Sequence, residues 1–340
     1  MTLDGPIDVP AALSRLAVRL AGKGARATGA QRLTGGASME TWAFVVEGPP
    51  NSKGGGREEL ILRRRSAPFD PESSRSTSLA AEAALITAAR ARGAPAPPLV
   101  HLCDEADGLG EAHVTRRVAG ETLGRRINSD ARFDGVRGLL ARQCGEVLAR
   151  IHSADPPKAA NLKFADAAVE LDRYEEVYRA SGAERPVLEL AFRYLRDRRP
   201  APRAPVLLHG DFRNGNLIID PEKGLAAVLD WELSHIGDPA EDLGWICVNS
   251  WRFGHPERPV GGFGDYADLL AGYEAAGGDP IPLERLRFWQ ALGSLKWGVM
   301  CLTMYMSWAS GAAASVERPM IGRRVSETEI DLVNILEAGL

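Results

Sequence analysis

The stretch that decides the fold reads Val206-Leu-Leu-His-Gly-Asp-Phe-Arg-Asn-Gly-Asn-Leu-Ile-Ile219, and Ala227-Val-Leu-Asp-Trp231 follows it closely. Two apolar runs enclose a polar loop that carries Asp211 and Asn216, and a further apolar run ends at Asp230. Short apolar runs bounded by polar loops are typical of buried strands. A carboxylate that receives a hydroxyl proton, with an amide and a second carboxylate that hold Mg²⁺, suits phosphoryl transfer. The pattern therefore predicts a phosphoryl-transfer site.

These residues resemble the aminoglycoside phosphotransferase/choline kinase superfamily, the protein-kinase-like kinases of small molecules. The family signature His-Gly-Asp-x-x-x-x-Asn reads here from His209 to Asn216, and the metal-binding Asp of the family matches Asp230. Its Asp-Pro-x-x-Asp-Leu element runs from Asp238 to Leu243. The chain is also similar to the bacterial phosphotransferase group that includes kinase domains associated with acyl-CoA dehydrogenases. The resemblance implies an α+β, bilobal fold with a small antiparallel-sheet N-lobe and a larger, mostly helical C-lobe.

The resemblance also implies a role for each polar residue of the loop. Asp211 would orient the acceptor hydroxyl, while Asn216 and Asp230 would hold the metal. Arg213 would contact the transferring phosphoryl group, with a solvated loop position as the alternative. His209 belongs to the catalytic set and is expected to support the loop through hydrogen bonds. Considered alone, Asp211 or Asp230 could be an ordinary turn or cap residue. The combined spacing of Asp211, Asn216 and Asp230 favours a catalytic role.

Three acidic residues follow this loop. Asp-Pro before a helical pattern is a typical helix start, so we expect Asp238 and Asp242 to cap a helix and brace the loop. For Glu232, a supporting or metal-side role is the less favoured interpretation, and an ordinary polar position is the favoured one.

The order of predicted elements matches two lobes, residues 1–118 and 119–340. In the first lobe, apolar spacing and β-rich runs predict helices over 9–20 and 78–92 and strands near 30–33, 41–46, 59–63, 99–103 and 112–118. In the second lobe, helical spacing predicts helices over 135–152, 167–198, 262–277, 283–311 and 326–340. The long segment 167–198 fits the helical insertion that builds acceptor pockets in this superfamily.

The predicted N-lobe carries the nucleotide-binding candidates. Gly35, Gly36 and Ser38 lie between the first two strands, where glycine lets backbone N–H groups approach phosphates. A plain hairpin turn is the alternative. Backbone groups from Arg116 to Val118 form the expected hinge that meets the adenine.

An arginine stands where protein kinases carry a strand lysine. The resemblance implies that Arg63 takes that role and pairs with Glu82. Strand alternation places Arg63 and Arg64 on opposite faces, and Arg64 is the competing choice. Arginine can grip phosphates bidentately, so this departure need not abolish activity.

Composition limits the remaining possibilities. The 340-residue chain has a net charge of −4, which argues against broad nucleic-acid or membrane binding. Its four cysteines are scattered without metal-ligand spacing, as in a cytoplasmic protein with reduced thiols. No signal peptide is recognisable at the N-terminus. We expect a cytoplasmic monomer or homodimer.

These observations predict a Mg²⁺-dependent O-phosphotransferase that moves the γ-phosphate of ATP or GTP to a small hydroxylated acceptor. A metabolic hydroxyl, such as that of a hydroxyacyl-CoA, is favoured over an antibiotic. A nucleotide-binding pseudokinase is the alternative, supported by the arginine in place of lysine. Acidic residues near the C-terminus could meet a cationic acceptor, although a solvated helix face explains them better: Glu317, Glu327, Glu329, Asp331 and Glu337.

Overall fold

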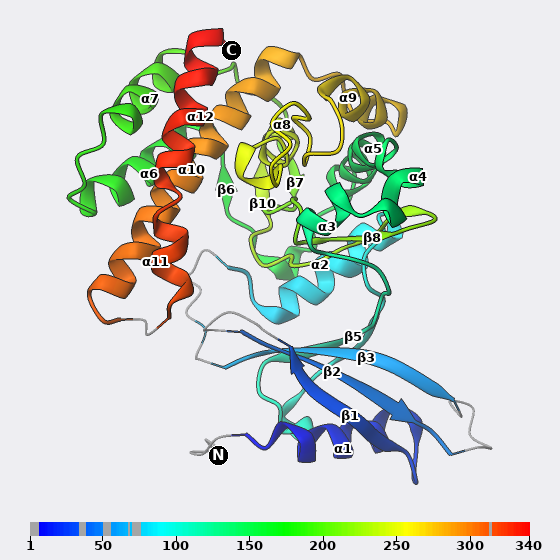
Figure 1. Ribbon diagram of the computed structural model, residues 1–340. Helices are drawn as coiled ribbons and strands as arrows, with labels where there is room; N and C mark the ends of the chain where they lie inside the picture. Colours follow the sequence, from blue (N-terminus) through cyan, green and yellow to red (C-terminus); the bar gives the residue numbers. More distant parts are fainter. Residues whose placement is uncertain (1–6, 34–38, 50–55, 67–68, 70–75, 313–314) are drawn as a thin grey trace. The chain divides into compact units, whose positions relative to one another are not determined.

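The computed structural model describes residues 7–33, 39–49, 56–66, 69, 76–312 and 315–340. The chain divides into two compact units. The first comprises Met1–Ala119 with the short pieces Asp155–Asn161 and Trp231–Leu233. The second comprises Gly120–Ala154, Leu162–Asp230 and Ser234–Leu340. Figure 1 labels their helices and strands.

The first unit is built on an antiparallel sheet with the strand order β1-β2-β3-β5-β4. Central strand β3 pairs with β2 on one side and with β5 on the other. The five strands are β1 (Arg26–Leu33), β2 (Met39–Glu47), β3 (Arg57–Arg65), β4 (Leu99–Leu102) and β5 (Ala112–Arg116).

Two helices accompany this sheet. Helix α1 (Val9–Ala21) covers one face (Figure 1), and Asp8 caps it by accepting a hydrogen bond from the Ala11 N–H. Its apolar stripe packs on Phe44, Leu60 and other buried strand residues to form a continuous core. Helix α2 (Leu79–Ala91) begins at the Ser78 cap and contacts β4 and β5.

Strands of the second unit frame the polar loop. β7 (Val206–Leu208) pairs antiparallel with β10 (His235–Gly237), which pairs in parallel with β6 (Phe164–Ala165). β8 (Leu217–Asp220) and β9 (Gly224–Val228) form an antiparallel pair. The loop from residue 209 to 216 therefore runs from the end of β7 to the start of β8.

Helices make up the rest of the second unit. The buried central helix α10 (Leu283–Ala309) contacts α6, α7, α8, α11 and α12, and α5 packs on α9. Their bounds are α3 (Gly124–Ser129), α4 (Asp134–Arg137), α5 (Leu140–His152), α6 (Ala167–Ala180), α7 (Pro186–Asp197), α8 (Ala240–Trp245), α9 (Tyr266–Ala275), α11 (Glu317–Gly322) and α12 (Val325–Ala338).

Two predicted helices are wrong in their extent. The segment 167–198 is not one helix but the pair α6 and α7. Gly182 adopts φ +64 and Pro186 stands in the first turn of α7, so the chain turns between them. Likewise, the segment 135–152 is divided into α4 and α5 at Gly138.

The predicted α+β fold class is confirmed, since the first unit holds the antiparallel sheet and helices dominate the second. Across the part of the chain that the structure describes, none of the helices combines the length and the apolar character that a membrane span requires.

Candidate catalytic site

The polar loop is held from below by the buried carboxylate of Asp242 in α8. Its two oxygens accept hydrogen bonds from the backbone N–H groups of His209 (2.8 Å) and Gly210 (2.9 Å). His152 Nε2 contacts the same carboxylate at 3.1 Å. Burial favours the neutral acid, but His152 and His209 outweigh it and keep the pKa of Asp242 below its ordinary value. Asp242 thus braces the loop, as the sequence predicts.

His209 is buried, and both nitrogens of its ring form hydrogen bonds with backbone groups. Nδ1 accepts a hydrogen bond from the Asp211 N–H (3.2 Å), so the proton resides on Nε2, which donates to the Leu229 carbonyl (3.0 Å). Both ring nitrogens are therefore engaged in shaping the loop. This geometry suits the supporting role expected for His209.

Asp211 and Asn216 meet across the loop. The amide nitrogen of Asn216 donates to Asp211 Oδ2 (2.7 Å) and to the Asp211 carbonyl (3.0 Å). These two bonds fix the carboxylate and turn the amide so that its oxygen, not its nitrogen, is the atom available to a cation.

The β8–β9 hairpin brings Asn216 beside Asp230. Leu217 pairs with Val228, and the Leu229 N–H donates to the Asn216 carbonyl (2.7 Å), so Asp230 comes directly after the residue that bonds to Asn216. Asp230 adopts φ +65, a left-handed conformation that non-glycine residues rarely take and that is common at functional sites. An amide oxygen and a carboxylate are the hard oxygen ligands that Mg²⁺ prefers. The donor set therefore fits the implied metal.

Arg213 is turned back onto the loop. Its Nε lies 2.9 Å from Asp211 Oδ1, and its guanidinium stacks over the ring of Trp251 at 4.5 Å. The side chain is thus held between the Asp211 carboxylate and the Trp251 ring. Its contact with a phosphoryl group stays a prediction.

In the first unit, Arg63 is enclosed by carboxylates. Its Nε lies 3.3 Å from Glu82 Oε2, and its terminal nitrogen lies 2.9 Å from Glu232 Oε2. Burial opposes ionisation of Glu82, yet the charge of Arg63 and the neighbouring imidazole of His113, 3.8 Å away, keep its pKa below the ordinary value. Arg64 points elsewhere, to Glu40 at 2.7 Å. The expected pairing of Arg63 with Glu82 is therefore present, and Glu232 joins it.

Two backbone N–H groups of the predicted hinge, residues 116–118, already donate hydrogen bonds. The N–H of Arg116 donates to the Pro98 carbonyl (2.9 Å) and that of Arg117 to the Glu59 carbonyl (2.9 Å). Both N–H groups are therefore used within the first unit. The backbone N–H of Val118 is the remaining hinge candidate for a hydrogen bond to the adenine ring. Gly35, Gly36 and Ser38 lie outside the described residues.

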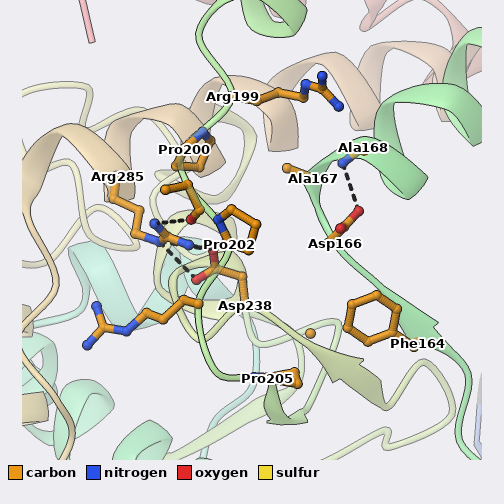
Figure 2. Close-up of a pocket in the computed structure, with 13 residues that line it drawn as sticks. Phe164, Asp166, Ala167, Ala168, Arg199, Pro200, Pro202, Pro205, Asp238 and Arg285 are labelled. Carbon is orange, nitrogen blue, oxygen red and sulfur yellow. Dashed lines mark hydrogen bonds and ion pairs between the residues drawn. The ribbon is translucent and has the colours of Figure 1, made fainter.

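A cavity of about 350 Å³ lies at the opposite end of β7 from the catalytic loop (Figure 2). Pro200, Pro202 and Phe164 line it, and Arg285 on its wall is held by Asp238 and the Ala201 carbonyl. Asp238 also accepts a hydrogen bond from the Ala240 N–H at the start of α8, as expected of a capping residue. None of the predicted catalytic residues lines this cavity, so it does not mark the catalytic site.

Another group of potential metal ligands lies in the first unit. Ligand atoms of His101, Cys103 and Asp107 all lie within 4.8 Å of one another. However, the guanidinium of Arg19 contacts Asp107 at 2.8 Å, and burial raises the pKa of the Cys103 thiol to about 12. Because the guanidinium of Arg19 already pairs with the Asp107 carboxylate, we assign no metal to these three residues.

Two residues at the catalytic loop escaped the sequence interpretation. Asn214 is fully buried and donates to the carbonyls of Trp251 (3.1 Å) and Gly261 (2.7 Å), which anchors the loop to the segment that follows α8. The indole of Trp245 donates to Asp211 Oδ1 (2.8 Å). From sequence, an Asn beside Gly215 is typical of a turn and a Trp is typical of the core. Neither residue type in these positions indicates a contact with the loop.

Comparison with known proteins places this geometry in context. The family model described as "Phosphotransferase enzyme family" matches residues 29–278. The mouse (Mus musculus) protein "Acyl-CoA dehydrogenase family member 10" is 30% identical over 162 residues, which cover 46% of this chain and 15% of that protein. The chain spans less than a third of the length of the curated relatives it matches.

Solved structures share the fold. A Ralstonia eutropha protein assigned to the aminoglycoside phosphotransferases superposes with a TM-score of 0.70 at 20% identity, over 98% of this chain and 100% of that one. The aminoglycoside phosphotransferase APH(4)-Ia, crystallised as a ternary complex with AMP-PNP and hygromycin B, gives a TM-score of 0.59 at 15% identity, over 96% and 98% of the two chains. At these identities, the superpositions establish the fold alone.

Proposed function

Because this chain belongs to the phosphotransferase enzyme family, we propose that it is a Mg²⁺-dependent kinase that moves the γ-phosphoryl group of ATP or GTP to a hydroxyl of a small molecule. The observation that carries the proposal is the loop itself. Asp211 is held by Asn216 at 2.7 Å, and the β8–β9 hairpin brings Asn216 beside Asp230. In this arrangement the Asp211 carboxylate would face the acceptor, and the Asn216 amide oxygen and the Asp230 carboxylate would bind the metal.

Each residue then has a defined task. Asp211 orients the acceptor hydroxyl and takes its proton as the oxygen bonds to phosphorus, a contribution that rests mainly on positioning. Asn216 and Asp230 would hold Mg²⁺, which neutralises charge on the nucleotide phosphates when bound. In the first unit, Arg63 would pair with phosphate oxygens, for which guanidinium geometry is well suited.

Charged residues near the C-terminus support a choice between acceptor classes. Acidic residues near the C-terminus are engaged within the protein: Glu329 pairs with Arg185 (3.3 Å) and Glu327 with Arg324 (2.9 Å). A polycationic antibiotic would have to displace these pairs. Relatives named as acyl-CoA dehydrogenases favour a hydroxyacyl-CoA or a similar metabolic hydroxyl.

The alternative is a nucleotide-binding pseudokinase. It is favoured by one observation, that an arginine, Arg63, stands at the lysine position and is already paired with Glu82 and Glu232. Such a protein would bind Mg-nucleotide but would transfer no phosphoryl group.

The deciding experiment measures release of nucleoside diphosphate from Mg-ATP and Mg-GTP against a panel of acceptors. The panel contains hydroxyacyl-CoAs, choline-like amines, macrolides and aminoglycosides, and Asp211→Ala serves as the inactive control. Acceptor-stimulated release that the variant lacks is expected with a hydroxyacyl-CoA. Nucleotide binding without release across the panel would instead favour the pseudokinase.

Asp230→Ala tests the metal assignment. Loss of a carboxylate ligand is expected to weaken Mg-nucleotide binding about 10- to 100-fold, as removal of a charge-assisted contact does. Titration calorimetry with Mg-ATP, and with ATP in EDTA, checks this result. The expected difference between variant and wild type is present with the metal and absent without it; equal weakening in both conditions would contradict the assignment.

A further inference from the structure

Trp245 lies at the last position of α8 and reaches the catalytic loop with its indole N–H. The nitrogen donates to Asp211 Oδ1 at 2.8 Å, and the ring is 6% exposed. Arg213 Nε contacts the same oxygen at 2.9 Å, whereas Asn216 contacts Oδ2. Among the described residues, Oδ1 therefore receives two donors and Oδ2 one. A carboxylate oxygen has two lone-pair sites, so the two oxygens of Asp211 are not equivalent.

A buried cation lies over the ring of this indole. Lys296 Nζ is 5.7 Å from the centre of the Trp245 ring, within the range of a cation–π contact. Two carboxylates fix the ammonium group, Glu241 at 2.6 Å and Glu170 at 2.7 Å. Glu241 lies one turn before Trp245 on α8. The ring is thus held by its own helix and by Lys296 of α10.

Building a charge into the core is costly unless it is paired and hydrogen-bonded. The mechanism described above uses none of the three charged residues directly. Their arrangement is explained if they hold the indole in one orientation, because a cation over the ring face restricts its rotation and polarises its N–H.

We propose that Trp245 is a positioning residue for Asp211, held in place by Lys296 with Glu170 and Glu241, and that it selects Oδ2 as the oxygen that takes the acceptor proton. This inference rests on the proposed kinase function. In the transfer step, the acceptor O–H bond breaks and its proton moves to Asp211 Oδ2. The acceptor oxygen bonds to the γ-phosphorus, the bond from phosphorus to the bridging oxygen breaks, and the nucleoside diphosphate leaves.

The contact itself can be tested without turnover. The chain contains seven tryptophans, whose indole N–H signals can be assigned by single Trp→Phe substitutions in ¹⁵N-labelled full-length protein. In Asp211→Ala, the Trp245 indole proton is expected to move upfield because its acceptor has gone. The Trp297 indole, which has no hydrogen-bond partner among the described residues, is expected to stay in place.

Kinetics test the consequence, and the chain offers a matched control. Trp245→Phe removes the donor but keeps an aromatic ring, and Trp297→Phe makes the same change in a neighbouring buried tryptophan that does not contact Asp211. Trp245→Phe is expected to lower kcat about 10- to 100-fold, the worth of one hydrogen bond to a charged group. Its KM for Mg-nucleotide and its melting temperature should match those of Trp297→Phe.

The outcomes separate this inference from the function on which it rests. Equal kcat in the two variants, or an unchanged Trp245 signal in Asp211→Ala, would overturn the positioning role. If wild-type protein releases no more diphosphate than Asp211→Ala with any acceptor, the kinase proposal fails, and the proposed proton route fails with it. A moved signal together with a selective fall in kcat would support the inference.

Discussion

Asp211→Asn lowers kcat for phosphoryl transfer about 100- to 10,000-fold, the range expected when a positioned proton acceptor is lost. The substitution preserves the shape of the side chain, and its carbonyl oxygen can still accept the Trp245 N–H that Asp211 Oδ1 accepts at 2.8 Å. The amide nitrogen, however, cannot take a proton from the acceptor hydroxyl. Steady-state kinetics with the acceptor identified by the panel measures the change.

The control is Asp220→Asn at the end of β8, the strand that follows the loop of Asp211. Asp220 receives the N–H groups of Glu222 (2.8 Å) and Lys223 (2.9 Å) at a turn, which an asparagine oxygen can also do. Its kcat should equal that of wild type. A similar loss in both variants would mean that the effect is general, and wild-type turnover in Asp211→Asn would remove the catalytic assignment.

Local patterns were sufficient for much of the fold. The β-rich runs in the first 118 residues correspond to strands β1 to β5, because alternating or continuous apolar residues must face a core whatever lies beyond. The closeness of the Asp211 and Asn216 side chains could likewise be predicted from their spacing. They are five residues apart in one loop, and their side chains form a hydrogen bond of 2.7 Å. The position of Asp230, two residues after the end of β9, followed from the β8–β9 pairing.

Contacts between distant parts of the chain could not be predicted in this way. The pair of Arg63 with Glu232 joins residues 169 positions apart, and no local period reports it. From sequence alone, a tryptophan is expected in the core and a lysine at the surface. The contact between Lys296 and Trp245 depends on the packing of α8 on α10, which no local pattern predicts. The break between α6 and α7 was missed because amphipathic spacing continues across Gly182.

The second large effect is expected from Lys296→Met, which removes a buried cation from two buried carboxylates. Lys296 is 6% exposed, and its partners Glu170 and Glu241 are 0% and 4% exposed. Removing one partner of a buried ion pair costs about 3–5 kcal/mol. Arg173, 2.6 Å from Glu170, and His235, 3.4 Å from Glu241, stay in place and offset part of the lost charge. We expect the free energy of unfolding in urea at neutral pH to fall by up to this amount.

The pH dependence and two further variants identify the cause. Lys296 and His235 overcome the effect of burial and keep the pKa of Glu241 below its ordinary value, so in wild type this group stabilises the fold above its unfolded pKa and the benefit is lost as the pH falls. Without the lysine, burial favours the neutral acid, and the deficit of Lys296→Met should shrink in acid as its carboxylates take up protons. Adding Glu170→Gln and Glu241→Gln removes those charges and should restore most of the stability, whereas exposed Lys223→Met should change it by less than about 0.5 kcal/mol. A deficit that is independent of pH and persists in the triple variant would point to lost packing instead of unpaired charge.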